Sequence, residues 1–140
     1  MHVIFSTKDR RPFLTSPIQE RLYPYLGGIA RESRLKSLAI GGVSEHVHLL
    51  ISLPATLAIA KGVQTLKSNS SKWMHETFPR LRSFAWQEGY GAFSIGRSGM
   101  ADTIAYIGNQ EEHHRKRTFR DEFESILRKH DIEFEPWMIE

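Results

Sequence analysis

The sequence contains no cysteine among its 140 residues. Disulfide bonds, thiolate nucleophiles and zinc sites built on cysteine are therefore excluded. No apolar run approaches the roughly 18 residues that a membrane-spanning helix needs, and no leader-peptide pattern opens the chain. No repeat and no Gly-, Ser- or Pro-rich linker divides the sequence. We therefore expect a single domain over residues 1–140 in a cytoplasmic protein with no membrane partner.

The chain also carries little excess charge of either sign. Nineteen Lys and Arg residues against sixteen Asp and Glu residues give a net charge of +3. This small positive excess favours anionic partners only weakly. A hydrophobic content of 40%, with 11% aromatic residues, suffices for one packed core and argues against disorder.

Hydrophobic periodicity predicts that strands and helices alternate along the chain. Strands are expected at residues 2–6, 37–41, 46–53 and 86–95, the last as one strand or two short ones. Helices are expected from Ser16 onward and at residues 56–77, 100–116 and 118–130. Pro24 and the pair Gly27-Gly28 predict that the first helix is kinked or begins late.

The order of these elements predicts the fold class. It matches the split β-α-β plan of a ferredoxin-like antiparallel sheet, an α+β fold with helices on one face and extra C-terminal helices. The other face of such a sheet needs a cover, and a partner subunit could supply it. The aromatic tail at residues 131–140 is expected to dock onto the protein.

The sharpest local feature is the His46-Val47-His48 segment within a predicted strand. Side chains alternate along a strand, so both imidazoles point to one face and can form half of a metal site. The alternative is an ordinary pair of histidines on a half-exposed strand. Glu45, beside the pair, could orient one imidazole by accepting a hydrogen bond from a ring nitrogen that does not bind the metal. A histidine-triad hydrolase would need a third histidine at position 50, which is Leu50, and the predicted helices exclude a cupin.

Tyr106 and Gln110 form the second feature. They are four residues apart on a predicted helix and so share a face. Gln110 could offer an amide oxygen to a metal ion, with the Tyr106 phenol beside it as a nucleophile for a bound phosphate. The alternative is that Tyr106 is an ordinary core residue. His114, one turn beyond Gln110, is a second choice of metal ligand or a DNA contact.

Basic residues form the third feature, because they could contact phosphate groups. The alternative is a set of solvated surface charges. The candidate DNA-binding residues are Lys8, Arg10, Arg11, Lys67, Lys72, His113, Arg115 and Lys116.

Taken together, these residues resemble the single-tyrosine HUH transposases of small bacterial insertion sequences, whose relatives include the REP-associated tyrosine transposases. The similarity runs along nearly the whole chain. It rests on residues 3–8 (VIFSTK), 45–50 (EHVHLL), 66–67 with 70–73, 86–90 with 93–94, 106–110 (YIGNQ) and 112–116 (EHHRK). The histidine pair alone is a weak motif, whereas the pair with a downstream Y-x-x-N-Q is specific.

The resemblance implies a dimeric, metal-dependent enzyme that cleaves and rejoins single-stranded DNA near hairpins at the ends of an insertion sequence. His46, His48 and Gln110 would bind Mg²⁺ or Mn²⁺. Tyr106 would be the nucleophile and form a 5′-phosphotyrosine, in the same subunit or in its partner. The protein would act in a bacterial or archaeal cytoplasm, at the nucleoid, on DNA rather than on a small-molecule substrate.

Two other functions remain open from the sequence. One is a domesticated relative that binds DNA hairpins without cutting them, although it would have no need to keep all four residues of the predicted site. The other is a metal-dependent phosphodiesterase that uses water as its nucleophile, with Tyr106 in a structural role.

Overall fold

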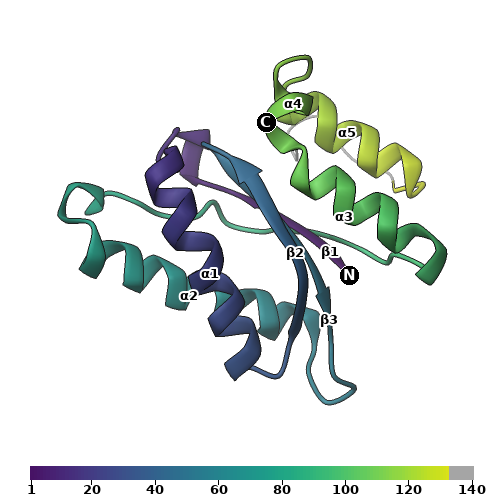
Figure 1. Ribbon diagram of the computed structural model, residues 1–140, viewed down its shortest axis with the longest axis horizontal. Coiled ribbons are helices and arrows are strands. Elements are labelled where there is room, and N and C mark those ends of the chain that lie inside the picture. The colour runs from purple at the N-terminus through teal and green to yellow at the C-terminus, as the bar shows by residue number, and fades with distance from the viewer. Residues whose placement is uncertain (133–140) are drawn as a thin grey trace.

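A four-stranded antiparallel sheet lies between two groups of helices in the computed structural model, which describes residues 1–132 (Figure 1). The strands are β1 (His2–Ser6), β2 (Lys36–Val43), β3 (His46–Ser52) and β4 (Gly91–Phe93). The helices are α1 (Ser16–Glu32), α2 (Ile59–Thr77), α3 (Met100–Gly108), α4 (Gln110–His114) and α5 (Phe119–Lys129). Short 3-10 turns lie at Lys8–Arg10, Pro79–Leu81 and Arg97–Gly99.

The strand order β2-β3-β1-β4 confirms the expected ferredoxin-like plan. Each neighbouring pair is antiparallel, and β1 lies between β3 and β4. The register places Ser6 opposite His46 and Ile4 opposite His48. The two central strands therefore bring the N-terminal segment directly beside the His46-Val47-His48 segment.

The two-residue period of the central strands divides the interior into two cores. Val3, Phe5, Val47, Leu49 and Ile51 belong to the larger core, which also includes buried residues of α1 and α2. Ile4, one position out of phase, belongs to a smaller core with residues of β4 and α5. The alternation of side chains along a strand explains this division.

Helix α1 is uninterrupted from Ser16 to Glu32, so the prediction that it begins late is wrong. Pro24 lies inside it and is exposed. The residues that α1 buries, Leu22, Leu26 and Ile29, follow a helical spacing, and their burial outweighs the hydrogen bond that Pro24 cannot donate.

Two other predicted elements are shorter than expected. The predicted helix at 100–116 is two helices, because Asn109 has non-helical dihedral angles (φ −108°, ψ 28°) between α3 and α4. The predicted strand at 86–95 contributes only β4 and an isolated bridge between Thr7 and Trp86. Residues 133–140, most of the tail that was expected to dock, lie outside the described residues.

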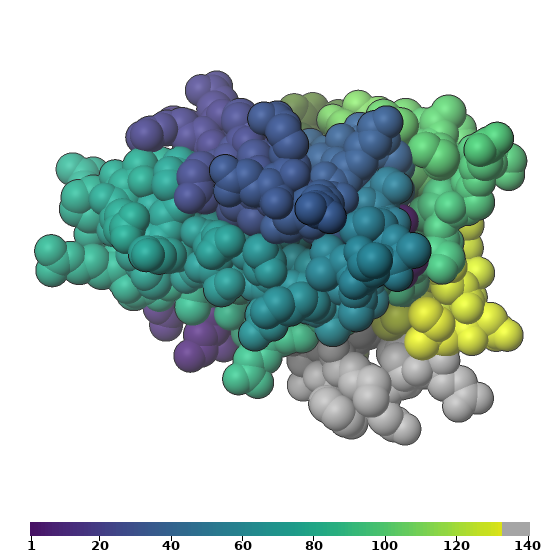
Figure 2. Space-filling view, turned by 90° about the horizontal axis from the view of Figure 1, so that it is seen from below, coloured from purple at the N-terminus to yellow at the C-terminus, as the bar shows by residue number. Residues whose placement is uncertain are grey.

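The second face of the sheet is covered by this chain itself. The sequence left open what covers this face, with a partner subunit as one candidate; α3 and α5 lie on it, on the side opposite α1 and α2 (Figure 1). Phe119 and Leu127 of α5 are buried against Ile4 and Phe93. Seen from below, the blue β2 and β3 region separates teal α2 from green α3 and yellow α5 (Figure 2). Among residues 1–132, no helix is long and apolar enough to cross a membrane.

Glycine permits the close approach of α3 to the sheet. A Cβ atom on Gly41 of β2 would lie 2.3 Å from the backbone oxygen of Ile107 in α3. A contact this short cannot be relieved by moving a side chain, because the obstructing atom belongs to the backbone. Any larger residue at position 41 must therefore displace α3, which carries Tyr106.

We predict opposite stability effects for two Gly-to-Ala substitutions. Gly41→Ala should lower the free energy of unfolding by roughly 1–3 kcal/mol, because it overpacks the contact between α3 and β2. Gly28→Ala should be neutral or raise it by up to about 1 kcal/mol, because Gly28 lies inside α1 with no atom within 4 Å of the added Cβ. Urea denaturation measures both. An unchanged stability for Gly41→Ala would contradict the close packing of α3.

Candidate active site

Histidines of β3 form the base of a buried polar cluster on the second face of the sheet. His46 and His48 are both fully buried, and their ring centroids lie 5.0 Å apart. The rings contact side chains of the C-terminal helices rather than the apolar residues of the larger core. The alternation within His46-Val47-His48 thus places both imidazoles under α3, α4 and α5.

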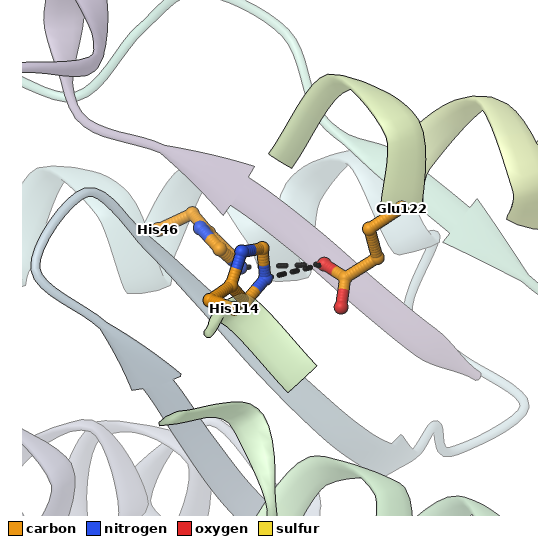
Figure 3. A group of neighbouring side chains, drawn as sticks. All are labelled: His46, His114 and Glu122. Carbon is orange, nitrogen blue, oxygen red and sulfur yellow. Dashed lines mark ion pairs between the residues drawn. The ribbon is translucent and has the colours of Figure 1, made fainter. Parts of the chain in front are cut away.

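Glu122 of α5 lies at the centre of this cluster, and the sequence analysis missed it. Its Oε1 atom lies 3.0 Å from Nε2 of His48, 3.2 Å from Nε2 of His114 and 3.4 Å from Nε2 of His46. Figure 3 shows His46, His114 and Glu122 pointing toward one another from three different elements. Glu122 is only 2% exposed. A single carboxylate oxygen therefore contacts three imidazoles.

Tyr106 and Gln110 complete the cluster from α3 and α4. The Tyr106 hydroxyl donates a hydrogen bond to Oε2 of Glu122. Oε1 of Gln110, a buried side chain, lies 3.3 Å from Nε2 of His46. The Tyr106 ring also lies close to the rings of His48 and His113. The structure thus brings together all four residues that the sequence analysis assigned to nucleophile and metal ligands.

His2 and Glu45 lie on the other side of the histidine pair, next to the Nδ1 atoms of the two rings. Nε2 of His2 lies 2.8 Å from Nδ1 of His48, at hydrogen-bond distance. Oε1 of Glu45 is 3.9 Å from Nδ1 of His46, and that nitrogen has no hydrogen-bond partner among the described residues. Glu45 therefore lies beside His46, as the sequence analysis expected for one imidazole of the pair, and His2 contacts the other imidazole. Nothing in the sequence indicated the contact of His2, which comes from a neighbouring strand.

Burial and the contacts within the cluster together set the pKa values of its residues. It lowers the pKa of His2 to about 3 and that of His48 to about 4, so both rings are neutral at pH 7. Burial alone would raise the pKa of Glu122, but its contacts with His114, His46 and His48 outweigh burial and hold that pKa well below its ordinary range. Burial and the hydrogen bond to Glu122 raise the pKa of Tyr106 above its ordinary value.

The donor atoms of the cluster suit a divalent cation. His46, His114 and Glu122 each offer one ligand atom, and these atoms lie within 4.8 Å of one another. Nε2 of His114 is buried and points toward the same carboxylate oxygen, 3.2 Å away, as a ligand of a shared ion would. The mixture of imidazole nitrogens with amide and carboxylate oxygens suits Mn²⁺ and also accommodates Mg²⁺.

A groove of about 1310 Å³ lies beside the cluster and has basic residues along its walls. Arg10, Arg115, Lys116 and Arg117 line it, together with His114 and the half-exposed ring of Tyr90. Acidic side chains, among them Asp9 and Asp121, also line it. The groove therefore combines cations for phosphate groups with an aromatic surface on which a base can stack.

The candidate DNA-binding residues occupy two regions. Arg10, Arg115 and Lys116 line the groove, the exposed Lys8 and Arg11 flank Arg10, and His113 packs on Tyr106. Lys67 and Lys72 lie on α2, the helix on the opposite side of the sheet. The Lys67 ammonium donates to the backbone oxygens of Gln87 and Gly89, at 2.6 and 2.9 Å, which anchors the loop before β4.

Comparison with known proteins identifies the family. The family model described as "Transposase IS200 like" matches residues 1–110. The chain belongs to the IS200-like transposase family. The family resemblance inferred from the sequence is thereby confirmed, and the protein is a DNA transposase. His46, His48, Tyr106 and Gln110 lie inside the matched segment, whereas His114 and Glu122 lie beyond it.

Curated relatives and solved structures agree with this family. The chain is 27% identical over 116 residues to the ISDra2 transposase TnpA of Deinococcus radiodurans, covering 79% of this chain and 83% of the relative. It is 25% identical over 117 residues to the IS200 transposase of Salmonella typhimurium, covering 79% and 76%. A crystal structure of a D. radiodurans R1 transposase superposes with a TM-score of 0.65 at 28% identity, covering 78% of this chain and 88% of that one.

A more distant structure shows the same fold. It is a REP-associated tyrosine transposase bound to a REP hairpin, with a TM-score of 0.61 at 16% identity. The superposition covers 81% of this chain and 66% of that one. The four-stranded sheet with its flanking helices is thus the arrangement of known transposases.

We predict that this transposase loses stability as the pH falls from 7 to 5. Unfolded histidine titrates near pH 6.5, so the unfolded chain binds protons between about pH 6.5 and 4 that His2 and His48 cannot bind when folded. The free energy of unfolding should fall by on the order of 1–2 kcal/mol for each of these histidines at pH 5. Urea denaturation in EDTA at both pH values measures this loss.

The variant His2→Gln serves as the control for this pH dependence. It removes one of the two buried imidazoles, so its loss of stability between pH 7 and 5 should be smaller than that of the wild-type protein. Equal stability of the wild-type protein at both pH values would contradict the burial of two neutral histidines.

Proposed function

We propose that this transposase cleaves and rejoins single-stranded DNA by covalent catalysis at Tyr106. The observation that supports this most directly is the meeting of the Tyr106 hydroxyl, His46, His48 and Gln110 in one buried cluster beside a groove with basic residues. A phenol next to converging metal-ligand atoms is the arrangement that phosphoryl transfer to tyrosine requires.

The residues that would hold the metal ion are His46, His48 and Gln110. A bound Mg²⁺ or Mn²⁺ neutralises phosphate charge and makes phosphorus more electrophilic. The neutral state of His48 leaves its nitrogen lone pair available for this purpose. His2 holds the His48 ring from behind through the 2.8 Å contact and so keeps Nε2 directed into the cluster.

The chain's own part in the reaction is to position the nucleophile. The hydrogen bond from the Tyr106 hydroxyl to Glu122 orients the phenol oxygen, whose lone pair would attack phosphorus. As the Tyr106 O–P bond forms, the P–O3′ bond breaks. The phenol proton leaves to water and O3′ takes up one proton from water, so the products are a free 3′-hydroxyl and a 5′-phosphotyrosine. A later 3′-hydroxyl reverses the step and joins new DNA, because the phosphotyrosine ester conserves the bond energy.

The groove would receive the single strand next to a hairpin at an insertion-sequence end. Arg10, Arg115 and Lys116 would contact phosphates, and Tyr90 could stack on a base. One solved relative is bound to a REP hairpin, which supports a hairpin substrate here. We also propose that the protein acts as a homodimer, as the family resemblance implies.

We predict that Tyr106→Phe abolishes covalent attachment to DNA but leaves DNA binding intact, because the change removes only the attacking oxygen. A denaturing gel with labelled single-stranded oligonucleotides from the flanks of the gene, with Mn²⁺, Mg²⁺ or EDTA, measures attachment. Tyr90→Phe is the matched control, since it removes a phenol oxygen that lies in the groove but outside the cluster. This control should form the adduct normally.

Other outcomes of the gel identify other functions. Metal-dependent cleavage without attached protein would indicate a phosphodiesterase that uses water, with Tyr106 in a structural role. Hairpin binding by the wild-type protein without any cleavage would indicate a domesticated DNA-binding relative. Normal adduct formation by Tyr106→Phe would exclude Tyr106 as the nucleophile.

We predict that each active site is formed within one chain, because Tyr106 lies against His48 of its own chain. Tyr106→Phe and His48→Ala are each expected to be inactive. Mixing the two variants should then restore no cleavage, since neither chain carries a complete site. Recovered cleavage would instead show that a homodimer exchanges Tyr106 between its subunits.

A further inference from the structure

We propose that Glu122 of α5 is a ligand of the divalent ion, so that metal binding fastens the C-terminal helix over the active site. The inference rests on the proposed function for the presence of the ion. Glu122 would join His46, His48 and Gln110 as a ligand. It lies outside residues 1–110, the segment that the family model matches.

The spacing of the donor atoms supports this assignment. Adjacent ligands of a six-coordinate ion with bonds of about 2.1 Å lie about 3.0 Å apart. Oε1 of Glu122 is 3.0, 3.2 and 3.4 Å from the Nε2 atoms of His48, His114 and His46. Oε1 of Gln110 is 3.3 Å from the same atom of His46. Each of these four pairs of atoms therefore already has the spacing of neighbouring ligands on one ion.

The negative charge of Glu122 also supports its assignment as a metal ligand. Amide and neutral imidazole ligands bring no negative charge to a dication, whereas hard cations such as Mg²⁺ prefer carboxylate oxygens. Glu45 cannot supply that oxygen together with Nε2 of His46, because Glu45 lies on the Nδ1 side of the ring. Glu122 is 2% exposed, and its contacts keep it ionised despite this burial. It therefore brings to the cluster the negative charge that a divalent ion requires.

The same carboxylate connects the ion to the nucleophile and to α5. Oε1 faces the imidazoles, while Oε2 accepts the hydrogen bond of Tyr106. Glu122 lies one turn from Phe119, which is buried against the sheet. Any ion that binds Glu122 therefore favours the docked position of α5, and docked α5 favours the ion by the same factor.

The deciding experiment measures metal affinity rather than DNA cleavage. Isothermal titration of the full chain with MnCl₂, in the absence of DNA, compares the wild-type protein with Glu122→Gln, Glu124→Gln and His48→Ala. Glu122→Gln should weaken Mn²⁺ binding at least about tenfold, because even residues outside the ligand shell change affinity by that much. Glu124→Gln removes the same charge from a residue of α5 that pairs with Arg128, and it should bind as the wild type does.

Each other outcome has a defined meaning. Unchanged affinity in Glu122→Gln would overturn the assignment, and so would tighter binding, which would mean that the carboxylate obstructs the site. If His48→Ala loses Mn²⁺ binding while Glu122→Gln keeps it, only this inference fails. If His48→Ala also binds Mn²⁺ as tightly as the wild type, the metal site of the proposed function fails too.

Hydrogen exchange of α5 provides an independent readout. Mn²⁺ should slow amide exchange over Phe119–Lys129 in the wild-type protein and in Glu124→Gln, but not in Glu122→Gln. Exchange without metal shows whether Glu122→Gln is folded, because Phe119 and Leu127 hold α5 on the sheet without Glu122. Equal protection by Mn²⁺ in all three proteins would contradict a ligand on α5.

Discussion

The meeting of one carboxylate with three imidazoles and a phenol is the interaction on which the rest of the active site depends. His46 and His48 are buried polar groups and Tyr106 is half-buried, and a buried polar group is costly without a partner. Glu122 contacts all three from one position. This requires α5 to lie directly on the sheet and α3 to approach β2 at Gly41. The packing of the C-terminal helices on the sheet therefore decides whether these side chains meet at all.

The two faces of the sheet divide the tasks of stability and chemistry. The face toward α1 and α2 buries an uninterrupted apolar core, which accounts for most of the hydrophobic stabilisation. The other face has its imidazoles in the two central strands, with a small apolar core around Phe93 and Phe119. Because β1 and β3 are held on both sides by neighbouring strands, the larger core also fixes the positions of the imidazoles. Rigid central strands are a suitable support for side chains whose mutual positions must be held to within about 0.5 Å.

The family match and the local structure describe different parts of the site. Residues 1–110, which match the model of the IS200-like transposases, include the histidine pair, Tyr106 and Gln110. His114 and Glu122 follow that segment and come to the same point in space through α4 and α5. The proposed site thus combines side chains from the segment that the family model matches with contacts that the C-terminal helices contribute.

The sequence by itself determined the features that depend on local periodicity: the strand at residues 2–6, the strand that begins at His46, the long helix ending at Thr77, and the pairing of Tyr106 with Gln110. Only the tertiary structure decided which groups meet across long separations. His48 meets Glu122 over 74 residues and His2 over 46, and no spacing rule connects such positions. The tertiary structure also decided three other features: the break between α3 and α4 at Asn109, the short length of β4, and the covering of the second face of the sheet. These features follow from packing against distant segments, which local propensity does not describe.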